Sequence, residues 1–477
     1  MADISYLCLS DMHLGAENSL LTRLVPDPAH PKLLIADPHV ASDVLVQLAA
    51  CLRAVVSHNR PNHKPRLILN GDVLELALAN VNTAAMVFER FMELTMKPGQ
   101  ELFDSTMYYV PGNHDHHLWE VARETQYMEN YIAGVPWGGN LVAPWHATNM
   151  FLGNYKDVPS YFLNRLIVRM GYPEGKQPRV LTLYPNLGLL SRDKNKCVVF
   201  SHGHYLESIY ELMTTVRSVL FPGNKVPGKI WDLEAENFAW IDFFWSTLGR
   251  SGEAGADVEL IYDKMQDQKH FGKLLDNIAR YINKQIRFPD ILWIRGKLIS
   301  QALKATLGKL AEREVKDTGQ PLSQEAEAGL KVYLETLLRA QIADENGSPV
   351  PRDLTFIFGH THKPFERSRD YQGYAGAVQL FNSGGWVVDS QSPTPIHGGA
   401  VIVVDEELNS ASIRMYNETT DDRLPPSSPS VSSQLPNKLT TRLEGIIGRT
   451  PAWDAFTEAV HKTIPLQRKN LQMKIMQ

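Results

Sequence analysis

Short apolar runs alternate with amphipathic segments through the first third of this chain. Strand-like runs cover Ile4–Leu9, Leu67–Leu69 and Met107–Val110, and apolar residues recur at helical spacing in Val40–Ser57 and Thr83–Leu94. Such an alternation of strands and helices predicts a sheet flanked by helices.

The pattern loosens between residues 140 and 195 and then returns to strand-like runs. Val180–Tyr184 and Leu187–Leu190 flank Pro185-Asn186, a pair typical of turns, and predict a hairpin or a bulged strand. Five further strands are predicted, at Cys197–Phe200, Leu354–Phe358, Val378–Phe381, Ala400–Val404 and Ala411–Tyr416.

Residues 205–351 are predicted to form a mainly helical insertion in this pattern. Helices are predicted at Asp257–Arg287, Ile291–Ala311 and Ser323–Ala343. A further amphipathic face is formed by Leu206, Ile209, Tyr210, Met213, Val216 and Leu220. The segment Trp231–Leu248 is rich in aromatic residues, and two interpretations stay open: packing between helices, or a wall of a pocket or partner surface.

The last part of the chain changes composition. Residues 424–438 are rich in Pro and Ser and predict a linker, and Leu439–Thr463 predicts a helical segment. We therefore predict a discontinuous core of residues 1–204 and 352–423, the insertion of residues 205–351, and a linker with a C-terminal helical segment in residues 424–477.

Composition limits the possible partners and compartments. The chain has 477 residues and a formal net charge of −5, so no global basic field favours nucleic acid, although a local basic groove stays compatible. The three cysteines are odd in number, and Cys8 and Cys197 lie in apolar runs, which is typical of a reducing compartment. The sequence contains no run of 18 apolar residues, so we expect no membrane-spanning helix. No signal peptide is expected before Ile4–Leu9. We expect a cytoplasmic protein; its oligomeric state is left open.

Five short polar motifs follow apolar strand-like runs. They are Asp11-Met12-His13, Gly71-Asp72, Gly112-Asn113-His114-Asp115, His202-Gly203-His204 and Gly359-His360-Thr361-His362. Because strands bring their carboxyl ends to one edge of a sheet, we expect these motifs to converge. Their mixture of imidazole, carboxylate and amide groups suits Mn, Fe, Zn, Co or Ni better than Ca or Mg.

The charge of such a site also indicates its substrate. Two divalent cations would be neutralised only in part by Asp11 and Asp72, even with a bridging hydroxide. The remaining positive charge suits a phosphate anion, and the hydroxide would be a competent nucleophile at neutral pH.

The five motifs resemble those of the calcineurin-like metallophosphoesterase superfamily over about residues 3–120, 196–204 and 354–405. The resemblance implies an α/β fold, a four-layer αββα sandwich, here with a large helical insertion as a cap. It assigns Asp11, His13, Asp72 and His362 to one metal ion, and Asp72, Asn113, His202 and His360 to the other. It also implies that His114 stabilises or protonates the leaving group.

Finer motifs resemble bacterial UDP-diacylglucosamine pyrophosphohydrolases. These are Gly71-Asp72-Val73-Leu74-Glu75, Gly359-His360-Thr361-His362-Lys363-Pro364 and Asn382-Ser383-Gly384-Gly385-Trp386. Those enzymes are much shorter and lack the insertion. Residues 11–15 are equally similar to double-strand-break repair nucleases, but the long heptad coiled coil of that subfamily is missing from this sequence.

Several residues next to the motifs have two interpretations each. Asp115 could orient His114 or cap a helix, and Glu75 could brace the ligand loop or begin a helix, with the helix start preferred. A substrate contact or a structural role is open for four more side chains. Three of them are the predicted substrate contacts, His117, His204 and Lys363, and the fourth is His116.

The sequence thus predicts a dinuclear, metal-dependent hydrolase of phosphate esters, most simply a phosphodiesterase or pyrophosphohydrolase. A metal-bridging hydroxide would attack phosphorus while His114 assists the leaving group. Manganese is the expected metal, with Fe, Zn, Co or Ni as alternatives. The rival functions are a nuclease, a protein phosphatase and a metal-binding scaffold without activity.

Overall fold

The computed structural model describes residues 2–221, 223, 226–247, 319–347, 350–432 and 434–475. The helices predicted at Asp257–Arg287 and Ile291–Ala311 lie outside these residues. None of the described helices is both long and apolar enough to cross a bilayer.

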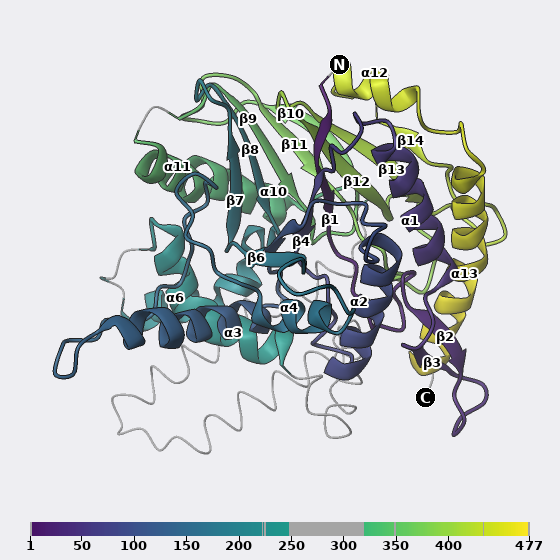
Figure 1. Cartoon of the computed structure of the whole chain (residues 1–477), viewed down its shortest axis with the longest axis horizontal. Helices are drawn as coiled ribbons and strands as arrows, with labels where there is room; N and C mark the ends of the chain where they lie inside the picture. The colour runs from purple at the N-terminus through teal and green to yellow at the C-terminus, as the bar shows by residue number, and fades with distance from the viewer. Residues whose placement is uncertain are drawn as a thin grey trace.

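Two β-sheets form the centre of the described part of the chain (Figure 1). The seven-stranded sheet has the order β14 (Ser430–Val431), β13 (Ser410–Asn417), β12 (Gly398–Asp405), β1 (Ile4–Leu9), β4 (Arg66–Asn70), β5 (Thr106–Val110) and β6 (Arg179–Thr182). The five-stranded sheet has the order β10 (Phe365–Arg369), β11 (Val378–Asn382), β9 (Asp353–Phe358), β8 (Lys196–Ser201) and β7 (Asn186–Leu190). A separate hairpin pairs β2 (Arg23–Pro26) with β3 (Leu34–Asp37).

Parallel pairing decides where the strand ends lie. In the seven-stranded sheet β1, β4, β5 and β6 run parallel to one another, and in the five-stranded sheet β8, β9 and β11 do so. The carboxyl ends of β1, β4 and β5 therefore meet at one edge, and those of β8 and β9 meet at the corresponding edge of the other sheet.

The two sheets pack face to face with helices on both outer faces. Apolar side chains of both sheets, such as Ile68, Val198 and Ile402, fill the space between them. The seven-stranded sheet is covered by α1 (Asp43–Val56), α2 (Val81–Thr95), α4 (Tyr161–Val168), α12 (Lys438–Glu444) and α13 (Pro451–Ile475). The five-stranded sheet is covered by α10 (Gln324–Val332), η7 (Tyr333–Leu338) and α11 (Arg339–Asn346). This four-layer arrangement confirms the predicted αββα fold class.

Two sequence predictions need correction. The runs around Pro185 do not form a hairpin, because β6 pairs with β5 in one sheet and β7 pairs with β8 in the other. Both runs are apolar enough to be buried in either sheet, so the pattern could not show that the chain crosses between them. The Pro- and Ser-rich segment is not only a linker, since it contains β14, which adds to β13.

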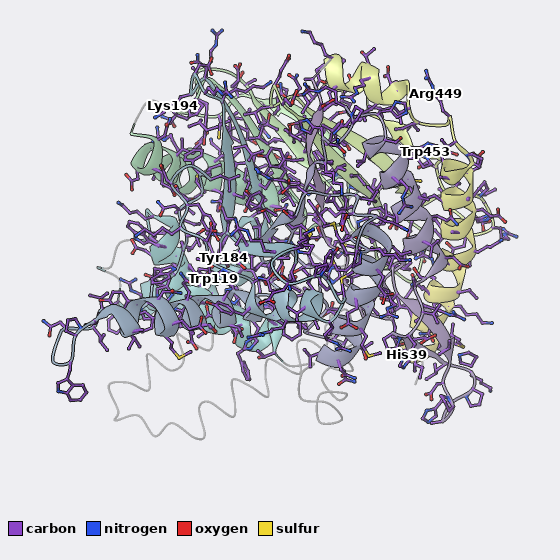
Figure 2. All side chains as sticks on the ribbon, in the orientation of Figure 1. His39, Trp119, Tyr184, Lys194, Arg449 and Trp453 are labelled. Atoms are coloured by element: carbon purple, nitrogen blue, oxygen red, sulfur yellow. The ribbon has the colours of Figure 1, made fainter. Side chains whose placement is uncertain are left out.

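The C-terminal segment is longer than its pattern predicted. Helix α12 begins after Asn437, whose side chain caps it, and α13 continues to Ile475 with Pro465 inside it. Helix α13 packs along α1 through Trp453, Phe456 and Val460 (Figures 1 and 2).

The described aromatic residues of the insertion divide between packing and solvent. Trp245 is buried, and the Trp240 indole N–H donates to the Ile209 carbonyl at 2.9 Å, whereas Trp231 and Phe243 are exposed. Trp240 and Trp245 thus belong to the packing of α6 (Ile230–Ile241) and η5 (Asp242–Ser246), which supports the packing interpretation for these two residues.

A buried polar network joins the insertion to α3 (His117–Gln126), the helix that follows the third motif. The Glu234 carboxylate is fully buried; its Oε1 lies 2.8 Å from His116 Nε2, and its Oε2 accepts from Tyr184 Oη at 3.0 Å and from Tyr205 Oη. Figure 2 shows Tyr184 next to Trp119 of α3, with which it stacks. Burial alone would lower the pKa of His116, but the Glu234 carboxylate outweighs it and raises that pKa to about 10.

Removing Glu234 is expected to leave a buried cation without its nearest carboxylate. Glu234→Ala should lower the free energy of unfolding by about 3–5 kcal/mol, the usual cost of breaking a buried ion pair from one side. The pKa of His116 is higher in the folded than in the unfolded protein. The ion pair therefore contributes fully to the free energy of unfolding below pH 6.5, and this contribution declines as the pH approaches about 10. Urea unfolding of the wild type and Glu234→Ala at pH 6 and pH 9 should show a smaller difference in the free energy of unfolding at pH 9; a constant difference would contradict the ion pair.

Candidate metal centre

The five motifs converge at one edge of the sandwich, as predicted. The Asp11 amide donates to the Gly71 carbonyl at 2.9 Å, and the His13 amide donates to the Asp72 carbonyl at 2.8 Å. The Gly359 amide donates to the His202 carbonyl at 2.9 Å. Main-chain bonds therefore hold the motif loops against one another independently of any ligand.

Unusual backbone angles turn the motif side chains inward. Asp11, His13, Asp72, His360 and His362 have φ values of 49°, 44°, 49°, 68° and 53°. Residues other than glycine rarely adopt this left-handed conformation, and such strain is typical of functional sites. Five such residues in one cluster indicate that the surrounding structure holds these side chains in place at the cost of an unfavourable backbone conformation.

Glycines allow the loops to approach the carboxylates closely. A Cβ atom on Gly359 would lie 1.9 Å from Asp11 Oδ2, and one on Gly112 would lie 2.2 Å from Asp72 Oδ1. Neither position can take a side chain without moving a carboxylate, which explains glycine in both motifs.

The motif side chains form two adjoining groups. In the first, His362 Nε2 lies 3.2 Å from His13 Nε2 and 3.4 Å from Asp11 Oδ1. In the second, Asp72, His202 and His360 place one potential ligand atom each within 4.8 Å of one another.

Two further contacts connect the groups and extend the second one. Asp72 Oδ2 lies 3.2 Å from His202 Nε2 and 3.8 Å from His13 Nε2, so this carboxylate lies between the two groups. Asn113 Oδ1 is 3.0 Å from His202 Nε2, which adds the amide to the second group.

This donor set fits two divalent cations. Asp11 Oδ2 is buried and has no hydrogen-bond partner among the described residues. The Nδ1 atoms of His13 and His362 face the carboxylates of Glu75 and Asp389, so the Nε2 lone pairs face each other across the site. Two opposed lone pairs and an unpaired carboxylate oxygen are stabilised by a cation between them.

Glu75 braces two site histidines at once, which corrects the preferred interpretation of it as a helix-start residue. Its Oε2 lies 2.9 Å from His13 Nδ1, its Oε1 lies 2.9 Å from His114 Nδ1, and its side chain is buried. Burial would raise its pKa, but the two histidines, above all His114, lower that pKa to about 2. Glu75 therefore stays ionised and orients both rings.

His114 lies beside the first group, where it can face a substrate. Its ring is edge-on to that of His13 at a centroid distance of 4.9 Å, and its amide donates to Asp72 Oδ1 at 2.8 Å. Burial would lower the pKa of His114, but Glu75 and Asp72 outweigh it and raise that pKa to about 9. These carboxylates favour the protonated ring, which is the form that donates a proton.

Asp115 has a different role from the expected one. Its buried carboxylate accepts from the amides of Val73 and Gly112, both at 2.7 Å, and from those of Asp72 and Leu74. In the described structure it serves these four amides, and it neither orients the His114 ring nor caps α3 with its side chain. Asp115 instead ties the second motif loop to the third.

The three predicted substrate contacts lie in different surroundings. His204 is buried, and its Nε2 lies 3.2 Å from Tyr184 Oη. His117 Nδ1 lies 3.0 Å from Asp242 Oδ1 of the insertion, and Lys363 is partly exposed beside His362. Direct substrate contacts of His117, His204 and Lys363 stay predictions.

Two outer partners of the site could not be predicted from any motif. Asp389 lies in a loop without a motif, yet its Oδ2 faces His362 Nδ1. Glu207 lies within the insertion, and its Oε2 is 3.4 Å from His360 Nε2. Each contact joins a motif histidine to a residue that lies outside the motifs and far from that histidine in the sequence.

The αββα sandwich and this edge cluster define a metal-dependent hydrolase. Residues 5–213 match the family model of the calcineurin-like phosphoesterase, which indicates a metal-dependent phosphoric ester hydrolase. His360 and His362 lie beyond the matched residues, and the fold brings them to the matched motifs. A search of curated proteins finds no match to the chain.

Loss of the Glu75 charge is expected to weaken metal binding without removing a ligand. Glu75→Gln should lower Mn²⁺ affinity at the site that uses His13 by about 10–100-fold, the usual effect of an outer carboxylate. Isothermal titration with Mn²⁺ measures this directly. Glu89→Gln on α2 replaces another buried glutamate and should leave both affinities unchanged. Equal affinities in wild type and Glu75→Gln would contradict the bracing role.

Proposed function

We propose that this protein hydrolyses phosphodiesters or pyrophosphates at a pair of divalent metal ions, manganese in the first instance. One ion would be held by Asp11, His13, Asp72 and His362, and the other by Asp72, Asn113, His202 and His360. The observation that carries the proposal is the position of Asp72, whose Oδ2 lies within 3.8 Å of an imidazole nitrogen from each group. A single carboxylate between two ligand groups can bridge the two ions of a dinuclear centre through its two oxygen atoms.

The chain's own residues supply the remaining chemistry. When bound, the ions would neutralise the phosphate oxygens and lower the pKa of water. His114 would donate a proton from its ring to the departing oxygen, while Glu75 holds Nδ1 and thus fixes the orientation of Nε2. Buried Asp115 keeps the loops of Asp72 and Asn113 in register during this step.

A diester or pyrophosphate is favoured over a monoester by the finer motifs. The segments 71–75, 359–364 and 382–386 resemble those of UDP-diacylglucosamine pyrophosphohydrolases. In this structure Asn382 supports the same edge, because its side-chain amide donates to the Gly359 carbonyl at 2.8 Å. The insertion would select the substrate, since it begins beside His202 and ends before β9, the strand that leads to His360.

A hydrolysis screen of the Mn-loaded protein tests this proposal. The substrates are p-nitrophenyl phosphate, bis-p-nitrophenyl phosphate, UDP-sugars, single- and double-stranded DNA, and a phosphopeptide. We expect kcat/KM for the diester or the UDP-sugar to exceed that for the monoester by at least about tenfold, a difference of roughly 1.4 kcal/mol in transition-state binding. Asp72→Ala protein, purified in parallel, controls for contaminating phosphatases.

Other results of the screen would favour the rivals. Faster cleavage of DNA would indicate a nuclease, and faster cleavage of the phosphopeptide would indicate a protein phosphatase. A protein that binds Mn²⁺ and hydrolyses none of these substrates would support the scaffold.

A further inference from the structure

The ligand histidines share a feature that lies outside the metal centre itself. Three of them turn their second ring nitrogen to an oxygen atom of the sandwich core. His13 Nδ1 faces Glu75 at 2.9 Å, His362 Nδ1 faces Asp389, and His202 Nδ1 lies 3.4 Å from the Asn70 carbonyl. An outer oxygen of this kind fixes the ring orientation and the tautomer of a ligand histidine.

The fourth ligand histidine, His360, follows the same rule with a partner from outside the core. Its Nε2 lies 3.4 Å from Oε2 of Glu207, in the first turns of the insertion. With Nε2 directed to this carboxylate, Nδ1 is the ring nitrogen left for the second ligand group. The orientation of the His360 ring in the second ligand group thus depends on Glu207, a residue of the insertion.

The insertion holds Glu207 in place from both sides. The residue lies between η3 (His204–Leu206) and η4 (Ser208–Glu211). Ser208 Oγ donates to the Glu325 carboxylate in the first turn of α10. Trp240 of α6 donates to the Ile209 carbonyl at 2.9 Å. A Cβ on Gly329 of α10 would lie 2.1 Å from the Leu206 carbonyl oxygen, so the backbone of this helix is in close contact with the turn that precedes Glu207.

A ring contact supports the same placement of His360. Tyr210 of η4 is edge-on to the His360 ring at a centroid distance of 5.1 Å, and Trp245 lies at the same distance from Tyr210.

We propose that Glu207 is a positioning residue for the metal centre: its carboxylate accepts the proton of His360 Nε2 and thereby directs Nδ1 to the second metal ion. The insertion then contributes to metal affinity as well as to the surroundings of the substrate. This inference rests on the proposed dinuclear function. The side chain of Glu207 is 32% exposed, so solvent weakens the interaction and the expected effect lies near the lower limit for outer carboxylates.

The test measures the two Mn²⁺ affinities of the full chain by isothermal titration, supported by electron paramagnetic resonance of free Mn²⁺. The variants are Glu207→Gln, Glu207→Ala and the control Glu211→Gln, which changes the same residue type four positions further along the same turns. We expect one of the two affinities to fall about tenfold in Glu207→Ala. The other affinity should stay within twofold, and Glu211→Gln should leave both unchanged.

A second measurement separates positioning from a general loss of structure. The thermal midpoint of each metal-free variant should equal that of the wild type, because the role of Glu207 is directed to the bound ion. Weakening of both affinities together with a lower midpoint would overturn the proposal, as would two wild-type affinities in Glu207→Ala. A wild-type protein that binds fewer than two Mn²⁺ ions would instead overturn the proposed function from which the inference starts.

Discussion

Asp72→Ala is expected to remove both metal ions and reduce turnover at least about 1000-fold, the upper range for loss of one electrostatic group in an active site. The carboxylate of Asp72 lies 3.2 Å from the nearest imidazole nitrogen of one ligand group and 3.8 Å from that of the other. Alanine would leave each group with opposed imidazoles and one fewer anionic ligand, so neither ion would be held tightly.

Metal analysis of the purified variant gives the decisive number. The wild type should contain two ions per chain and Asp72→Ala close to none, with turnover lost in parallel. Asp157→Ala is a suitable control, because Asp157 is exposed and pairs with Arg179 on the surface. Two ions still bound to Asp72→Ala would show that this carboxylate is not shared.

Periodicity in the sequence predicted most of the regular structure. Strand β1 matches the predicted run Ile4–Leu9, and α1 lies within the predicted Val40–Ser57, because period-2 and period-3.6 patterns report directly on which face is buried. Strand β10 was missed because Phe365 is its only apolar residue and the sequence there contains no apolar run. The crossing of the chain from one sheet to the other between β6 and β7 was also missed, because the partner strands, β5 and β8, cannot be identified from the local sequence.

The candidate site could be predicted where local motifs carry it. Asp11, His13, Asp72, Asn113, His202, His360 and His362 converge because each follows a strand whose carboxyl end reaches the same edge. The outer residues could not be predicted in this way. Asp389 and Glu207 act across long sequence separations, and only packing of the insertion and of the last loops decides which side chain meets which histidine.

The surroundings of Asp115 show the same limit within a motif. The sequence places Asp115 next to His114, which suggested a bond between neighbours. Instead, its carboxylate turns toward the loop amides of Asp72, Val73 and Leu74, where buried donors need an acceptor. Glu75, 39 positions away, takes the place next to the His114 ring. Satisfying buried main-chain donors thus outweighs sequence proximity.

His114→Ala is expected to lower turnover about 100-fold or more while both metal ions stay bound, the scale of a lost general acid. The reason lies in the position of the ring, which is braced by Glu75 at 2.9 Å and lies beside the ligand groups, not within either proposed ligand set. Because the ring would protonate the departing oxygen, the loss should be smaller for a good leaving group such as p-nitrophenolate than for an alkoxide.

Turnover of an aryl diester and an alkyl diester by the same variant measures this dependence. His39→Ala is the control: His39 is exposed and is labelled in Figure 2 on the loop before α1, and its removal should change neither rate nor metal content. Retention of two Mn²⁺ ions in His114→Ala separates the ring from the ligands. An equal loss for both esters would indicate that His114 stabilises charge on the phosphate and leaves the departing oxygen to another group.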